Sequence, residues 1–201
     1  MASWAELLTL ANPGEHVVQL YGVDDQLLTK NASRYLGEGL RRRDGLVVIA
    51  TPEHTAAIAR HLVEEGNGVA DEAERAGRLV YLDAAETLER LLHDGHVDAG
   101  RFEEVVGGAL RHAGARSGSG QVRAFGEMVG LLWSEERYAE AARLEELWNE
   151  VLADHACSLY CAYPIDLFDG GVAAELNPIV CSHHRLLAGS GTMLTSGRPR
   201  N

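Results

Sequence analysis

The stretch VVQLYGVDDQLLTK, residues 17–30, decides the fold, because it passes from an apolar run through a short loop into helical periodicity. Residues 17–21 predict a buried strand, and residues 24–43 predict a helix with apolar positions three or four residues apart. From Gly22 to Thr29 the loop has the spacing of the phosphate-binding motif G-x-x-x-x-G-K-[ST]. The scaffold of a nucleotide-binding loop is therefore expected here.

The residues that would give this loop its chemistry are missing. Leu27 and Leu28 stand where the motif has Gly-Lys, and the chain's single lysine, Lys30, comes two residues later. A helix turns about 100° per residue, so this lysine points roughly opposite to the required direction. Asp24 and Asp25 would repel phosphate where backbone N–H groups should attract it. The pattern favours a sensor or regulator over an ATPase.

Outward from this stretch, strands and helices alternate. The expected strands cover residues 17–21, 46–50, 78–83, 122–127 and 158–163, and the expected helices cover 24–43, 52–66, 86–93, 98–113 and a pair within 129–155. Such alternation predicts an α/β fold with a mostly parallel central sheet flanked by helices on both faces. We expect an N-terminal extension over 1–11, one domain over 12–187, and a disordered Gly/Ser/Thr/Arg-rich tail over 188–201.

Composition excludes several classes of function. The net charge of −12 argues against direct binding of nucleic acid, which needs clustered Lys and Arg. No apolar run approaches the roughly 20 residues of a membrane span, and the N-terminus lacks the pattern of a signal peptide. The three cysteines, Cys157, Cys161 and Cys181, are too few for a disulfide scaffold. We expect a cytoplasmic protein without contact to membranes.

Four phrases of the sequence, taken in order, carry a family resemblance. They are GEHVVQLY at 14–21, GEMVGLLW at 126–133, LEELWN at 144–149 and LYCAYP at 159–164. Together they resemble the MEDS domain, a sensory domain of methanogen and methylotroph regulators that include the dichloromethane-responsive repressor. The resemblance covers roughly residues 12–187 and implies a RecA/KaiC-like fold with a degraded P-loop.

That resemblance also bears on partners. Members of the family are usually attached to DNA-binding, kinase or sigma-factor-regulating domains, and no such output domain is recognisable in this chain. Either the chain acts alone through protein contacts, or its output partner is a separate chain; the resemblance implies that such a partner is a kinase, a sigma-factor regulator or a transcription factor. Self-association of the chain is left open.

Ligands of parallel α/β sheets bind at the carboxyl ends of the strands, near a topological switch point. This rule selects as ligand-binding candidates Tyr21, Gly22, Thr29, Thr51, His54, Asp83, Glu127, Met128 and Tyr163. Glu127 could contact a ligand or Mg²⁺, or it could cap the following helix or pair with an arginine. His54 could donate into a pocket or be a solvated residue in the first turn of its helix. Tyr21 and Tyr163 could form the aromatic walls of a pocket for a small, mostly apolar ligand, or pack in the core.

Metal binding and catalysis find little support in the sequence. Cys181-Ser182-His183-His184 lacks the paired spacing of a zinc site, and Cys157 and Cys161 stand too far apart along a strand to chelate one ion together. We expect buried structural thiols, no metal and no cofactor. The chain has neither a nucleophile motif of the G-x-S-x-G kind nor zincin spacing, so no catalytic residue is expected.

Three functions remain. The first is a non-enzymatic sensory or regulatory domain that binds a small ligand of unknown identity and signals through protein contacts. The second is a nucleotide-binding switch with weak ATP or GTP affinity, held by backbone N–H groups around Gly22 and by the hydroxyl of Thr29. The third is a structural interaction module with a vestigial pocket.

Overall fold

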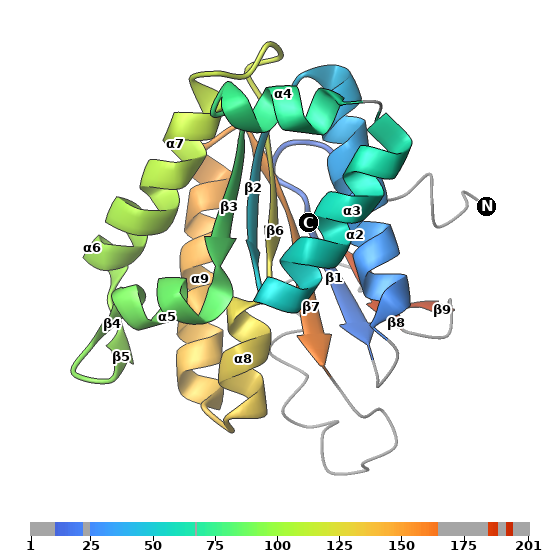
Figure 1. The fold of residues 1–201 in the computed structure, drawn as a ribbon. Coiled ribbons are helices and arrows are strands. Elements are labelled where there is room, and N and C mark those ends of the chain that lie inside the picture. Colours follow the sequence, from blue (N-terminus) through green and yellow to red (C-terminus); the bar gives the residue numbers. More distant parts are fainter. Residues whose placement is uncertain (1–10, 22–24, 67, 165–184, 189–191, 195–201) are drawn as a thin grey trace, which may run out of the picture.

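The computed structural model describes residues 11–21, 25–66, 68–164, 185–188 and 192–194 of the 201-residue chain. Its centre is a sheet with the strand order β3-β2-β6-β7-β1-β8-β9. Strands β3, β2, β6, β7 and β1 are all parallel, so their carboxyl ends share the lower edge in Figure 1. The strand bounds are β1 His16–Tyr21, β2 Gly45–Ala50, β3 Leu79–Asp83, β6 Val122–Gly126, β7 Cys157–Pro164, β8 Arg185–Ala188 and β9 Thr192–Leu194.

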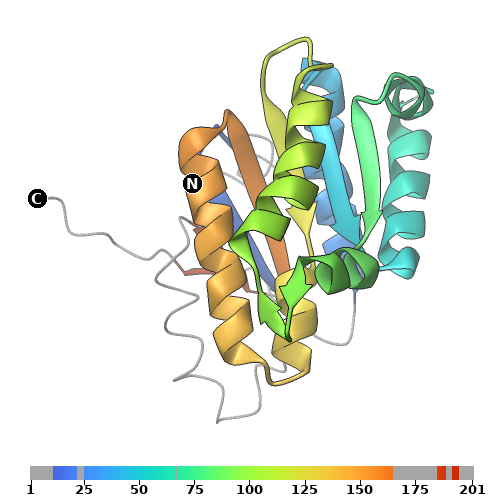
Figure 2. The same ribbon diagram turned by 90° about the vertical axis from the view of Figure 1, so that its left-hand side faces the viewer.

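Helices cover both faces of the sheet, as Figures 1 and 2 show. One face, called the α2 face, carries α2 Gln26–Arg42, α3 Pro52–Gly66 and α4 Val69–Arg75. The other, called the α9 face, carries α5 Ala84–Leu91, α6 Ala99–Phe102, the π-helical turn η1 Glu103–Gly107, α7 Gly108–Gly114, α8 Met128–Ser134 and α9 Tyr138–Asp154. The predicted fold class is confirmed, and the parallel sheet is consistent with a RecA-like fold.

Strand β2 shows why the sheet is buried on both faces. All six of its residues are buried. Val48 packs in the core of the α2 face, whereas Val47 and Ile49 pack in the core of the α9 face. Successive side chains of a strand point to opposite faces, so a continuous apolar run requires cover on both sides.

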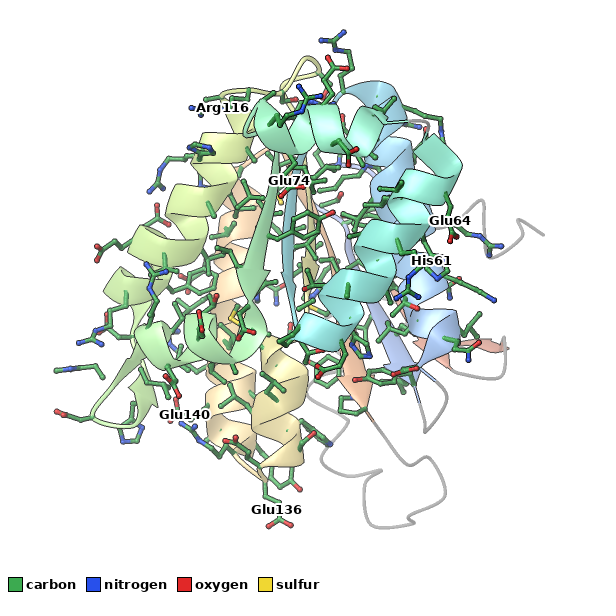
Figure 3. All side chains as sticks on the ribbon, viewed as in Figure 1. His61, Glu64, Glu74, Arg116, Glu136 and Glu140 are labelled. Atoms are coloured by element: carbon green, nitrogen blue, oxygen red, sulfur yellow. The ribbon has the colours of Figure 1, made fainter. Side chains whose placement is uncertain are left out.

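Some elements were not expected from the sequence. Helix α4 and strand β5 (His96–Val97) appear where no element was predicted. Strand β4 (Leu92–His93), which forms a hairpin with β5, replaces the end of the helix predicted over 86–93, because α5 ends at Leu91. Glu140 of α9, labelled in Figure 3, accepts hydrogen bonds from Val97 N and His96 Nδ1, both at 2.7 Å, and so holds the hairpin against α9. Strand β9 lies within the tail that was expected to be disordered.

A buried ion pair at the amino end of the sheet joins Arg123 of β6 to Asp44, the residue that precedes β2. Arg123 Nε donates to Asp44 Oδ2 at 2.9 Å, and both side chains are at most 2% exposed. The guanidinium also lies 5.1 Å from the centre of the Tyr35 ring. Gly39 of α2 leaves room for it, because a Cβ there would stand 2.9 Å from Arg123 Cδ and 2.5 Å from Leu46 Cδ2. This end of the sheet is closely packed.

The carboxyl end contains the topological switch point. The chain leaves β2 for α3 on the α2 face, whereas it leaves the neighbouring strand β6 for α8 and α9 on the α9 face. Two adjacent parallel strands whose connections diverge in this way open a crevice between them at their carboxyl ends. Within the described residues, no helix is both long and apolar enough to cross a membrane.

Candidate functional site

Glu127 lies at the switch point, directly after β6. Its backbone N donates to Ile49 O of β2 at 3.0 Å, which brings its side chain beside the residues that follow β2. The residue is 4% exposed. One carboxylate oxygen accepts a hydrogen bond from Thr51 N at 2.8 Å, and the other accepts one from His54 Nδ1.

These bonds exclude one interpretation of Glu127 that the sequence left open, namely that it caps the following helix. The side chain does not cap α8, the helix that it precedes. It accepts hydrogen bonds from the start of α3 instead, the helix that follows the neighbouring strand β2. The carboxylate thus links the two connections that diverge at the switch point.

His54 continues this arrangement into a hydrogen-bonded chain. Its Nε2 donates to Asp25 Oδ2 at 3.1 Å, while its Nδ1 faces Glu127. The hydrogen bond to Glu127, opposed by burial and helped by the charges of both carboxylates, raises the pKa of His54 from 6.5 to about 9. The ring is therefore a buried cation at neutral pH, and the alternative of a solvated residue is wrong.

Tyr21, at the end of β1, completes the group. Its ring lies edge-on to His54, with centroids 6.2 Å apart, and the residue is half-buried. Burial, together with the negative charges of Glu127 and Asp25, raises the pKa of its hydroxyl above the ordinary value of 10. The hydroxyl stays protonated at neutral pH and can donate or accept a hydrogen bond.

Two further candidates have local roles. Thr51 caps α3, because its Oγ1 accepts from His54 N at 3.3 Å. Asp83 ends β3 at the edge of the sheet, where it accepts from Glu86 N at 2.9 Å and caps α5. Thr51 therefore belongs to the switch-point group, whereas Asp83 serves the neighbouring helix.

The other candidates lie away from the group. Thr29 is buried, and its hydroxyl donates to Gln26 O at 3.2 Å within α2. Met128 and Tyr163 are buried in the core of the α9 face, where the Tyr163 hydroxyl donates to Glu145. Gly22 lies outside the described residues. The two tyrosines of the expected pocket are thus on opposite faces of the sheet.

Sequence reasoning missed the part that Asp25 plays. The pattern marks this residue only as the start of a helix, and its bond to His54 depends on α2 and α3 lying side by side on the α2 face. It also missed a buried cluster of His16, Glu145 and Cys161 on the other face. The members of that cluster are separated by 16 residues or more in the chain, so no local motif marks it.

The group can bind polar ligand atoms and exchange protons. A cationic imidazole stands between two carboxylates, one of them buried and the other half-exposed on Asp25. A ligand that competes for either bond changes how the starts of α2 and α3 are held. None of the residues in the group is an activated nucleophile.

Comparison with known proteins identifies a family for this chain. The model of the MEDS family, described as the methanogen/methylotroph, DcmR sensory domain, matches residues 15–184. The match extends over most of the chain and contains every residue of the group at the switch point. A search of curated proteins found no match.

Proposed function

The chain belongs to the MEDS family of sensory domains, and we propose that it senses a small molecule at the switch point between β2 and β6. The ligand would lie against Tyr21, His54 and Glu127. The response would pass to a separate regulatory protein, of the kinase, sigma-factor-regulator or transcription-factor class, through altered contacts on the helical surface.

One observation carries this proposal: the chain Glu127–His54–Asp25 connects three elements at the switch point. Glu127 follows β6, His54 lies in the first turn of α3, and Asp25 precedes α2. A ligand that displaces one bond acts on the starts of two neighbouring helices at once. The bonds thus offer a physical route from a bound molecule to the outer surface.

The chemistry of the group favours one class of ligand. Tyr21 supplies an aromatic face and a protonated hydroxyl, which suit a small, mostly apolar molecule with one polar group. A phosphate group is disfavoured at this site, because the carboxylates of Glu127 and Asp25 lie beside it. The Thr29 hydroxyl donates its hydrogen bond within α2 instead. The nucleotide-switch alternative therefore has no observation in its favour.

Equilibrium unfolding in urea tests the ligand site, and it works at room temperature with volatile compounds. The probes are dichloromethane and methanol, chosen from the one-carbon chemistry of methylotrophs, and Mg²⁺ with ATP. A ligand that binds only the folded chain at 100 times its Kd stabilises it by about 2.7 kcal/mol. The variants are Glu127→Gln and, as a matched control, Glu64→Gln, which alters an exposed carboxylate of α3 (Figure 3).

We expect a one-carbon probe to stabilise the wild type and Glu64→Gln but not Glu127→Gln. Stabilisation by Mg²⁺ with ATP would support the nucleotide switch instead. Equal stabilisation of all three proteins would place the ligand elsewhere, and no response to any probe would favour the structural module.

The regulatory partner needs an experiment in cells. Proximity labelling with the wild type and with Glu127→Gln, each with and without the stabilising probe, would identify neighbouring proteins. We expect a regulator whose labelling changes with the probe in the wild type alone. The same set of labelled proteins with and without the probe, in both the wild type and Glu127→Gln, would contradict signalling through this site.

A further inference from the structure

A second cluster of chemically active side chains lies under the α9 face. His16 begins β1, Cys161 lies in β7, and Glu145 lies in α9. All three residues are at most 3% exposed. The cluster is separate from the proposed ligand site, which lies on the other face of the sheet.

The parallel register brings the three together. Val18 of β1 stands opposite Cys161 of β7, and His16 precedes Val18 by two residues. Side chains two apart along a strand share a face, so His16 and Cys161 both point to the α9 face. Helix α9 crosses this face and places Glu145 above them.

The donor atoms are already close to one another. His16 Nε2 lies 3.2 Å from Cys161 Sγ, and His16 Nδ1 lies 3.7 Å from Glu145 Oε2. One donor atom from each residue lies within 4.8 Å of the other two. Around a tetrahedral zinc ion, bonds of about 2.0–2.3 Å place the donors roughly 3.3–3.7 Å apart. One imidazole supplies an ion with a single nitrogen, and Nε2 is the one beside the thiol, whereas Glu145 faces Nδ1. The donor atoms lie up to 4.8 Å apart, so the Glu145 carboxylate has to move by about 1 Å for the three residues to surround an ion.

We propose that His16, Glu145 and Cys161 bind a divalent cation of the zinc class. Imidazole nitrogen, thiolate sulfur and carboxylate oxygen form a donor set typical of zinc. On binding, the S–H bond of Cys161 breaks, its proton leaves for solvent and a metal–sulfur bond forms. The two negative charges of thiolate and carboxylate then balance the cation, so the buried site as a whole is neutral.

The surroundings of the cluster fit the same role. Asn149 Oδ1 lies 3.2 Å from His16 Nδ1, which orients the imidazole so that Nε2 faces the thiol. The Tyr163 hydroxyl donates to the other carboxylate oxygen of Glu145. Partners of this kind fix the orientation of metal ligands and tune their basicity.

An ion here would tie β1, β7 and α9 together beside the switch point. A Cβ added to Gly126 would stand 3.9 Å from Cys161 Sγ, and Gly126 immediately precedes Glu127. The cluster thus borders the strand that positions the proposed ligand site. The metal site stands on its own observations and does not depend on the proposed function.

The test uses the full chain, first stripped of metal with a chelator and then titrated with Zn²⁺ or Co²⁺. We expect one equivalent of Zn²⁺ to bind and to raise Tm by about 5–10 °C at a hundredfold excess over Kd. Co²⁺ should give the visible bands of a tetrahedral site and the near-ultraviolet band of a cobalt–thiolate bond. No binding and no Tm shift in the wild type would overturn the proposal.

Variants identify the ligands. Cys161→Ser should lose the cobalt–thiolate band, and His16→Gln should weaken Zn²⁺ binding at least tenfold. Cys157→Ser alters the neighbouring buried thiol of the same strand and should keep the band, as should Cys181→Ser. A band that survives in Cys161→Ser, or that disappears in either control, would contradict the assignment.

A milder variant keeps the test informative if a ligand substitution prevents folding. Asn149→Ala leaves all three ligands in place, and we expect Zn²⁺ affinity to fall about 10–100-fold while the cobalt–thiolate band remains. Unchanged affinity in this variant would contradict the orientation proposed for His16.

Discussion

One buried charged pair lies at each end of the neighbouring strands β2 and β6, and the two pairs differ in the chemistry of the cation and in its connection to the surface. At the amino end, Arg123 and Asp44 are at most 2% exposed, and the cation is a guanidinium that stays charged at any physiological pH. At the carboxyl end, the cation is the titratable His54, and its second carboxylate partner, Asp25, is half-exposed. The amino-end pair is thus buried throughout, whereas the carboxyl-end pair is itself buried but is connected to the surface through Asp25.

The difference between the pairs separates stability from sensing. The Arg123 side chain of the amino-end pair is closely packed against Tyr35 and Gly39, and both side chains of the pair are almost fully buried. The carboxyl-end pair lies where two chain connections diverge, and it holds the starts of two helices. The titratable carboxyl-end pair is the kind of group that a sensory domain needs. The fixed amino-end pair stabilises the sheet that holds it.

Breaking the amino-end pair should have the largest effect. In Arg123→Leu, Asp44 is left charged and buried, and we expect a loss of roughly 3–5 kcal/mol in the free energy of unfolding. Urea denaturation measures this loss. The double variant with Asp44→Asn should recover most of it, because the uncompensated charge is then absent; a loss under 1 kcal/mol in the single variant would contradict the role of the pair.

The carboxyl-end pair should instead make stability depend on pH. The pKa of His54 is about 9 in the folded chain and 6.5 in the unfolded chain. The contribution of its charged form to the free energy of unfolding is therefore complete below pH 6.5 and is lost as the pH rises through about 9. We expect a decrease on the order of 2–3 kcal/mol across this window. Urea denaturation at a series of pH values should show it in the wild type and not in His54→Gln; identical curves would refute the pairing.

Gly39 tests how tightly the amino end is packed. In Gly39→Ala the new Cβ would overlap Leu46 and the Arg123 side chain, and we expect a loss of about 1–3 kcal/mol although alanine favours helices. Gly108→Ala in α7 is the control, since the nearest atom there is 4.0 Å away, and it should be neutral or stabilising. Thermal unfolding of the two variants compares their stabilities. Equal effects would show that the amino end of the sheet is loosely packed around Gly39.

The smallest effect is expected at the exposed end of the hydrogen-bonded chain. Asp25→Asn removes a half-exposed charge from His54 Nε2, so the free energy of unfolding should change by only about 0.2–1 kcal/mol. NMR titration of the His54 ring should show a lower pKa than in the wild type. An unchanged pKa would mean that Asp25 takes no part in the chain.

Local patterns in the sequence predicted the scaffold but not the pairs. The apolar run of β2 and the Thr51-Pro52 start of α3 have signals within a few residues, and both were predicted close to their observed bounds. Glu127 was also selected, because the end of a buried strand can be recognised without knowing which strand lies beside it.

The partners of Glu127 required the order of the strands. His54 lies 73 residues away in the chain, and it meets Glu127 only because β2 and β6 are neighbours. Tyr163 was selected by the same rule, that ligands bind at the carboxyl ends of parallel strands, but it does not join the group. It lies near the end of the neighbouring strand β7, and its side chain points to the α9 face. The β4–β5 hairpin did have a local signal in Asp94-Gly95, both with positive φ, which was overlooked.

One NMR experiment can follow both charged pairs during titration with the probe that stabilises the chain in urea. Resonances of the His54 ring and of Arg123 Nε–H are recorded during titration with that probe. We expect the His54 signals to shift until the site is saturated, while the Arg123 signal stays in place. A shift at Arg123 with His54 unmoved would contradict the placement of the sensory site at the carboxyl end of β2 and β6.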